Sequence, residues 1–185
     1  IITVKEETID DAILATELLK KDSRIDSHNI FIIGHSMGGM LAPRIDSEGG
    51  KYKGLIIMAG TPRKLEDVML EQNEAVLSST KGLVNWIVRK QVAKLSGLFS
   101  GLYELSDEEA KKKKVMGGTT LYYFKEMGEH SVADYLATTK KPMLIVQGEK
   151  DFQVSVEKDF NEYKRLLNDK TNVEFRLYEN LNHAF

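Results

Sequence analysis

The fold of this chain is decided by the stretch Ile30-Phe31-Ile32-Ile33-Gly34-His35-Ser36-Met37-Gly38-Gly39-Met40. A short apolar run, a glycine-rich turn and then a helix-like pattern predict a strand that passes directly into a helix. A Gly-x-Ser-x-Gly sequence in that setting is typical of a strained turn, which lifts a serine hydroxyl clear of the sheet. Ser36 is therefore the candidate nucleophile.

The two glycines of this elbow, Gly34 and Gly38, are expected to let the strand and the helix approach each other without a Cβ clash. The helix that begins at the turn directs its free N–H groups and its positive dipole end toward Ser36, where an oxyanion would develop. The alternative is a glycine-rich turn with an incidental serine. The flanking strand and helix patterns favour the catalytic interpretation.

The chain has 185 residues, enough for one domain with a sizeable core. Its 26 Lys and Arg and 28 Asp and Glu give a formal net charge of -2, so no overall field attracts nucleic acid or an anionic membrane. The absence of cysteine excludes disulfides, thiol catalysis and thiolate metal sites. No apolar run approaches the length of a membrane span. Cytoplasm is favoured as the compartment, although a signal segment could lie upstream of Ile1.

Four short apolar runs lie at wide intervals: Asn29 to Ile33, Gly54 to Ala59, Pro142 to Gln147 and Val173 to Tyr178. The first three are nearly continuous, as expected of parallel strands covered on both faces, and the last alternates like an edge strand. Helical patterns flank these runs: one ending near Asp22, one from Met40 to Ile45 and one from Glu157 to Leu167. The sequence therefore predicts an α/β fold with four parallel strands and flanking helices.

One connection, residues 61–139, is too long for a simple crossover. It contains three helical patterns, from Leu65 to Gln72, from Val84 to Leu98, and from a capping box at Ser106 to Glu109. We therefore expect 61–139 to form a helical cap inserted into a core made of 1–60 and 140–185. The lysine run Lys111 to Lys114 lacks interleaved aromatic residues and is typical of a solvated helix face, so neither nucleic acid nor a membrane is predicted as a partner.

A serine hydroxyl attacks at neutral pH only when a base removes its proton, so a histidine and a carboxylate are expected elsewhere. Asp151 follows the third predicted strand and His183 follows the fourth. Both are therefore expected at the edge of the sheet that carries Ser36. The predicted roles are attack by Ser36, proton transfer by His183 and control of the imidazole tautomer by Asp151.

The elbow, the Gly-x-x-Asp-x-x-Val turn ending at Val154 and the terminal Asn182-His183-Ala184-Phe185 together resemble the α/β-hydrolase superfamily. The chain resembles the C-terminal two-thirds of such a core, from about residue 30 to residue 185. Ala42 to Ile45 and Ala59 to Asp67 are similar to bacterial esterases of that superfamily that carry a helical cap. The resemblance implies a serine hydrolase that cleaves carboxylic esters through an acyl-enzyme, with no metal and no organic cofactor.

The implied partner is a small-molecule ester, with an acyl pocket shaped by cap residues such as Trp86, Leu95 and Phe99. An acyltransferase or a peptidase with the same three catalytic residues is the alternative among enzymes. A catalytically silent interaction module is the alternative outside them. The sequence does not separate these functions.

Three other residues could compete for these roles. Glu149 could replace Asp151, but sequence parity is expected to point it away, and Asp159 falls within a helix. His35 lies beside the nucleophile, and the resemblance implies a packing or hydrogen-bonding role for it.

The resemblance also implies that part of the core is absent, because the family has eight strands and this chain supplies the last four. One oxyanion-hole N–H would come from the absent part, and only the other, on Met37, is present. Ile30 to Ile33 would be a central strand, so its unpaired edge invites pairing with another chain or with the missing N-terminal part. A final helix expected after His183 is also absent. We therefore expect a truncated piece of a larger enzyme.

Overall fold

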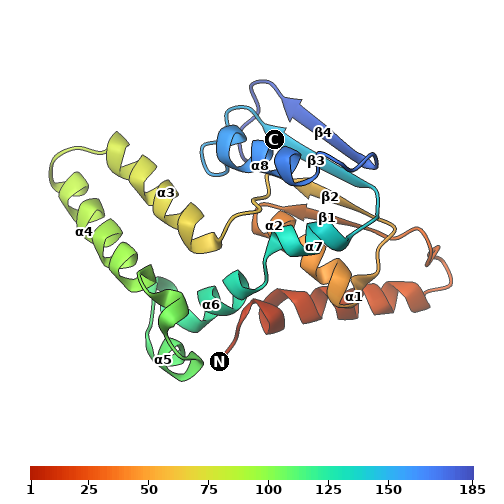
Figure 1. The fold of residues 1–185 in the computed structure, drawn as a ribbon, viewed down its shortest axis with the longest axis horizontal. Coiled ribbons are helices and arrows are strands. Elements are labelled where there is room, and N and C mark those ends of the chain that lie inside the picture. Colours follow the sequence, from red (N-terminus) through yellow and green to blue (C-terminus); the bar gives the residue numbers. More distant parts are fainter. The chain divides into compact units, whose positions relative to one another are not determined.

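The computed structural model describes residues 1–185, with the side chain of Met116 left out. The chain divides into two compact units (Figure 1). A sheet unit holds Lys5–Arg63 and His130–Phe185, and a helical unit holds Ile1–Val4 and Lys64–Glu129. Each unit is described by itself.

The sheet unit is built on four parallel strands in the order β1-β2-β3-β4. Their bounds are Phe31–His35 for β1, Gly54–Met58 for β2, Met143–Gly148 for β3 and Val173–Tyr178 for β4. All four arise from the predicted apolar runs. The α/β class with four parallel strands and flanking helices is therefore confirmed.

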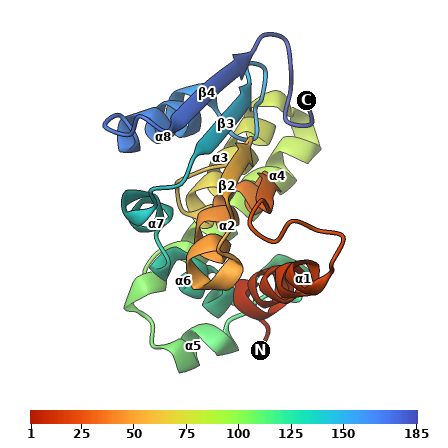
Figure 2. The same ribbon diagram turned by 90° about the vertical axis from the view of Figure 1, so that its right-hand side faces the viewer.

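Helices cover one face of this sheet (Figures 1 and 2). They are α1 (Asp10–Lys21), α2 (Met37–Ile45), α7 (Val132–Thr138) and α8 (Asn161–Leu166), which contact one another in that order. Shorter helical turns precede α1 (η1, Lys5–Ile9), follow α2 (η2, Asp46–Gly50) and precede α8 (η5, Val156–Phe160). Under this layer Ile57 and Ile145 are buried, and Phe160 packs edge-on against Phe175. This apolar layer holds the strand ends in place.

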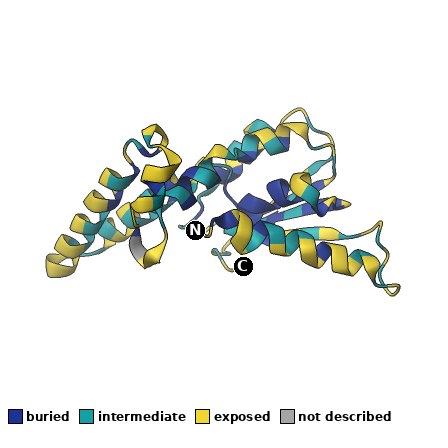
Figure 3. Cartoon of the chain, turned by 90° about the horizontal axis from the view of Figure 1, so that it is seen from below, coloured by how far each residue is buried: buried dark blue, intermediate teal, exposed yellow. Residues whose placement is uncertain are grey.

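The other face of the sheet is open at β1, which forms one edge of the sheet. Phe31 is 51% exposed and Ile33 is 64% exposed. In Figure 3, buried residues (dark blue) gather on the inner elements, whereas the outer sides of the helices are mostly exposed (yellow). An apolar edge strand of this kind is a template for pairing with another strand.

The helical unit consists mainly of α3 (Leu65–Ser79), α4 (Gly82–Phe99), α5 (Asp107–Lys112) and α6 (Leu121–Glu129). Single turns lie at η3 (Leu102–Glu104) and η4 (Met116–Gly118). The predicted capping box is confirmed, because the Ser106 hydroxyl accepts from the Glu109 N–H while the Glu109 carboxylate accepts from the Ser106 N–H. Compared with the predicted 61–139, this unit is shorter, and α7 belongs to the sheet unit.

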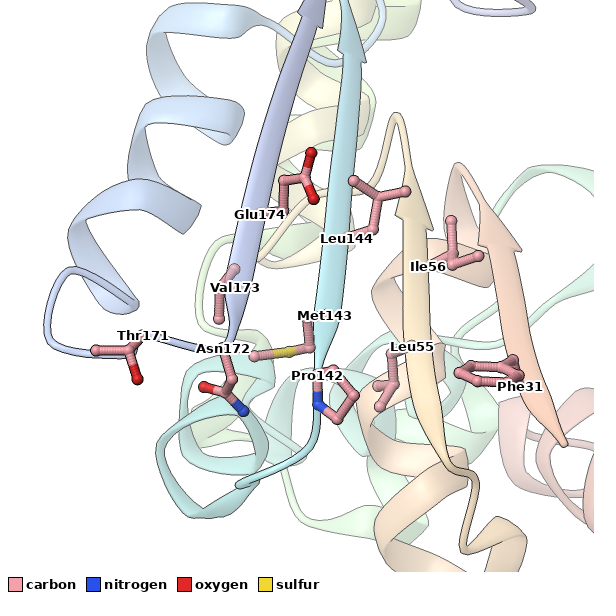
Figure 4. Close-up of a pocket in the computed structure, with 10 residues that line it drawn as sticks. All are labelled: Phe31, Leu55, Ile56, Pro142, Met143, Leu144, Thr171, Asn172, Val173 and Glu174. Atoms are coloured by element: carbon pink, nitrogen blue, oxygen red, sulfur yellow. The ribbon is translucent and has the colours of Figure 1, made fainter. Parts of the chain in front are cut away.

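A hollow of about 400 Å³ lies at the amino ends of the strands (Figure 4). Phe31, Met143 and Val173, each the first residue of its strand, are among its lining residues. This is the end of the sheet opposite to the candidate catalytic residues.

Candidate functional site

Ser36 lies between the end of β1 and the start of α2, in a strained turn. Its backbone has φ 56° and ψ -119°, a conformation that residues with a side chain rarely adopt. A Cβ added to Gly34 would lie 2.1 Å from the carbonyl oxygen of Gly38, so only glycine fits at position 34. The strand-to-helix turn predicted from the sequence is present.

Gly38 does not play the steric part expected of it. A Cβ added there would meet nothing within 4 Å, because the missing side chain faces open space. The close approach on the helix side is made by Gly39, where an added Cβ would lie 3.0 Å from the Gly34 carbonyl oxygen and 3.1 Å from the Gly60 Cα. The expectation of a clash-relieving Gly38 is therefore wrong, and Gly39 takes that place.

Asp151 lies in the turn that leaves the carboxyl end of β3, and it is buried. Its Oδ1 accepts hydrogen bonds from the backbone N–H groups of Gln153 (2.9 Å) and Val154 (3.1 Å). These two bonds close the turn around the carboxylate and leave Oδ2 for side-chain donors.

His183 joins the other two residues. Its Nδ1 donates to Asp151 Oδ2 over 2.8 Å, and its Nε2 lies 2.9 Å from the Ser36 hydroxyl. With the proton on Nδ1, Nε2 is an acceptor and the serine hydroxyl is the donor. The structure thus brings Ser36, Asp151 and His183 into one hydrogen-bonded line at the carboxyl ends of the strands.

His35 lies beside this line without being part of it. Its Nε2 donates to the backbone carbonyl of His183 over 2.6 Å, and the two rings are 4.9 Å apart between centroids. The imidazole that meets the Ser36 hydroxyl is that of His183. The hydrogen-bonding contact expected of His35 is present.

The two competing carboxylates lie elsewhere. Glu149 is exposed, as sequence parity predicts. Asp159 is fully buried and accepts from the Thr61 hydroxyl (2.6 Å), from Arg63 Nε (2.7 Å) and Nη2 (3.0 Å), and from a backbone N–H (2.8 Å). These partners occupy both carboxylate oxygens, so Asp159 has a structural role and is not available to His183.

Gln147 was not singled out from the sequence, yet its side chain contacts the site. Its Nε2 donates to Asp151 Oδ2 over 2.9 Å. The available signal was a polar residue within an otherwise apolar strand.

Met37 is the first residue of α2. Its N–H therefore has no acceptor within the helix and points from the helix N-terminus, where the dipole favours negative charge.

The expected acyl-pocket residues are not brought together. Trp86 is 53% exposed, whereas Leu95 and Phe99 are buried. Residues nine apart lie about 180° round an α-helix, so Trp86 and Leu95 occupy opposite faces of α4. Leu95 and Phe99 pack inside the helical unit, where Phe99 contacts Phe124 and also lines a hollow of about 400 Å³. A role of these residues toward an acyl group stays a prediction.

The residues that the structure describes contain no cluster of three or more His, Cys, Asp or Glu side chains arranged to hold a metal ion. In the same part of the chain, no helix combines the length and apolar character that crossing a membrane requires.

Comparison with known proteins identifies a matching family and a related protein. Residues 3–185 match the family model described as serine aminopeptidase, S33. Esterase EstD of Thermotoga maritima is 31% identical over 182 residues, which are 98% of this chain and 41% of that protein.

Solved structures share the fold. The esterase Pf2001 of Pyrococcus furiosus superposes with a TM-score of 0.60 at 20% identity, over 98% of this chain and 56% of its own. Est1E of Butyrivibrio proteoclasticus superposes with a TM-score of 0.62 at 16% identity, over 100% of this chain and 63% of its own. The chain thus spans about half the length of these relatives. Because the family model covers almost all of its residues, the chain belongs to the serine aminopeptidase S33 family of α/β-hydrolases.

Proposed function

We propose that this chain carries the catalytic residues of a serine hydrolase that cleaves carboxylic esters through an acyl-enzyme. One observation carries the proposal: the Ser36 hydroxyl lies 2.9 Å from His183 Nε2, while His183 Nδ1 lies 2.8 Å from Asp151 Oδ2. This is the geometry in which a serine can lose its proton to an imidazole held by a carboxylate.

The proposed reaction has two halves. In the first, Ser36 Oγ attacks the ester carbonyl carbon as its proton passes to His183 Nε2, and the resulting imidazolium is stabilised by Asp151. His183 then returns that proton to the leaving alkoxide as the C–O bond breaks. In the second half, His183 takes a proton from water, the hydroxide attacks the acyl-enzyme, and Ser36 leaves with the proton.

Charge on the tetrahedral oxygen needs donors, and we assign one of them to the Met37 N–H. Loss of a single such donor costs on the order of 10² to 10³ in turnover. We propose that a second donor, and a strand that pairs with the β1 edge, come from further polypeptide, either from a longer form of this protein or from another chain. The position of β1 at the edge of the sheet supports this proposal, as does the exposure of Phe31 and Ile33 on its open face.

We further propose that the helical unit acts as a cap that selects the acyl group. It is inserted between β2 and β3, and it exposes Trp86. A Trp86→Ala variant is expected to change the preference among acetyl, butyryl and octanoyl p-nitrophenyl esters. An unchanged preference would contradict the role.

A peptidase with the same three residues is the second candidate, because the matching family model is described as an aminopeptidase. The relative that is 31% identical is named an esterase, which favours esters. A panel of p-nitrophenyl esters and aminoacyl p-nitroanilides distinguishes the two.

Fluorophosphonate labelling tests the catalytic proposal, because the probe reacts with activated serines. We expect covalent labelling at Ser36 that disappears in Ser36→Ala, while the melting temperature is unchanged. The exposed Ser23 provides a matched control, since Ser23→Ala should be labelled like the parent chain. Absence of labelling in the folded parent chain would overturn the proposal in favour of a silent interaction module.

A further inference from the structure

The Gln147 side chain is almost completely enclosed at the carboxyl end of β3. It is 1% exposed. Its Nε2 lies 2.9 Å from Asp151 Oδ2, 3.0 Å from the Val154 carbonyl oxygen and 3.3 Å from the Gly148 carbonyl oxygen. All three neighbours are oxygen acceptors.

These contacts fix which way the amide points. An amide nitrogen donates two hydrogens, whereas the amide oxygen can only accept and would be repelled by three oxygens. The two shortest contacts therefore use the two hydrogens, one toward the Asp151 carboxylate and one toward Val154. The same turn is closed from the other side by the N–H of Val154, which donates to Asp151 Oδ1.

Asp151 Oδ2 is thus shared between two donors, the Gln147 amide and His183 Nδ1. We propose that Gln147 is a positioning residue for His183. It holds the plane of the Asp151 carboxylate so that Oδ2 faces the imidazole, and it acts on the reaction only through Asp151. The proposal rests on the catalytic function proposed above.

The surroundings of His183 allow the effect of Gln147 to be separated from those of the other side chains near the imidazole. Two described ionisable side chains meet its ring: Asp151, through the hydrogen bond, and His35, at 4.9 Å between ring centroids. His35 also binds the His183 backbone carbonyl. Gln147 contacts neither histidine through any of its three Nε2 contacts, so a change at Gln147 reaches the imidazole through the Asp151 carboxylate.

Two substitutions that preserve volume test the proposal. Gln147→Met removes both donors at every pH, and kcat is expected to fall about 10- to 100-fold with KM within about twofold. In Gln147→Glu, the introduced carboxyl can donate one O–H to Asp151 Oδ2 while it is protonated, but its ionised form repels that oxygen. The kcat of this variant relative to the parent chain is therefore expected to fall as the pH rises, whereas the Gln147→Met ratio stays flat.

If Gln147 had a purely structural role, its variants would lower the melting temperature and leave kcat unchanged. Thr16→Val serves as a control, because Thr16 is also buried and hydrogen-bonded, to the Tyr52 hydroxyl at 2.6 Å. It should lower the melting temperature and leave kcat unchanged. Melting temperatures of all variants are measured at each pH.

The outcomes separate the two proposals. If the parent chain is labelled by fluorophosphonate and both Gln147 variants keep its kcat, the positioning role is overturned while the catalytic function stands. If the kcat of Gln147→Glu equals that of Gln147→Met at every pH, hydrogen-bond donation from residue 147 to Asp151 is not the cause of the lowered kcat, and this part of the proposal is overturned. If the folded parent chain is unlabelled, the catalytic function and the positioning role fall together.

Discussion

Arg63 forms an ion pair with the fully buried Asp159, with Arg63 Nε 2.7 Å and Nη2 3.0 Å from the Asp159 carboxylate. Arg63 is the last residue before the helical unit begins at Lys64, and Asp159 lies in η5 after the Asp151 turn. The pair therefore joins the connection after β2 to the connection after β3.

Arg63→Ala is expected to lower the free energy of unfolding by about 3 kcal/mol, because it leaves a buried carboxylate without its cation. Urea unfolding measures the change. Arg165→Ala is the control, since its pair with Glu162 is largely exposed and should contribute under about 0.5 kcal/mol. Equal effects of the two variants would show that Asp159 is not held by Arg63.

Gly34→Ala and Gly38→Ala test the elbow against each other. At position 34 the new Cβ meets a backbone carbonyl oxygen at 2.1 Å, so we expect a loss of about 3 kcal/mol in unfolding free energy. At position 38 it meets open space, and alanine favours the helix, so stability should stay within about 1 kcal/mol of the parent or rise. Comparable losses at both positions, measured by urea unfolding, would refute this description of the turn.

Glu66→Gln is expected to change how stability depends on pH. Burial raises the pKa of the Glu66 carboxyl above its ordinary value, with the hydrogen bond from Tyr103 acting in the opposite direction. The folded chain therefore keeps this proton to higher pH than the unfolded chain does, and the contribution to stability is lost as the pH rises through the folded pKa. As the pH rises from the unfolded pKa through the folded pKa, the free energy of unfolding of Glu66→Gln should therefore increase relative to that of the parent chain.

Urea unfolding at a series of pH values checks the Glu66 prediction. Glu108→Gln provides a control of opposite sign, because the hydrogen bond from Lys111 lowers the pKa of Glu108. That side chain contributes stability above its unfolded pKa, and the variant loses this contribution near neutral pH. A pH-independent difference between Glu66→Gln and the parent would rule out the buried carboxyl as the cause.

Ile33→Lys tests the exposed edge of β1. The side chain is 64% exposed, so we expect a change in stability within about 0.5 kcal/mol. A charge there blocks strand pairing, so light scattering over a concentration series should show less self-association than in the parent chain. Leu18→Lys, on the exposed side of α1, should leave association unchanged. A parent chain that is monomeric throughout would contradict edge pairing.

Much of the sheet unit could be predicted from the sequence, because its strands are apolar runs bounded by turn residues. β4 has the predicted bounds, Val173 to Tyr178. β1 extends to His35, beyond the predicted end at Ile33, because Gly34 and His35 pair with Ile57 and Met58 although neither has strand-like character. Tertiary pairing overrode local preference there.

The helices between β2 and β3 were harder to predict. α6 and α7 were not expected, because they are only nine and seven residues long and show few turns of periodicity. The sequence did not show that Leu95 and Phe99 are buried, for a related reason. Periodicity marks the apolar face of a helix, but it does not say whether that face meets other helices or a ligand.

At the candidate site, Ser36, Asp151 and His183 could be located because residues that follow parallel strands gather at one sheet edge. The Gln147 contact could not be found this way, since it depends on the path of one turn. The roles of Gly38 and Gly39 depended in the same way on the exact direction of each missing Cβ.

The contact between Ser36 and His183 joins residues 147 positions apart, one beside each outer strand of the sheet. It forms only when β1, β2, β3 and β4 are all paired in their native alignment, because a slip by one residue turns side chains to the opposite face. The reactivity of Ser36 would therefore report whether all four strands of the sheet are correctly paired. During refolding, it should emerge last, after helix formation and collapse are complete.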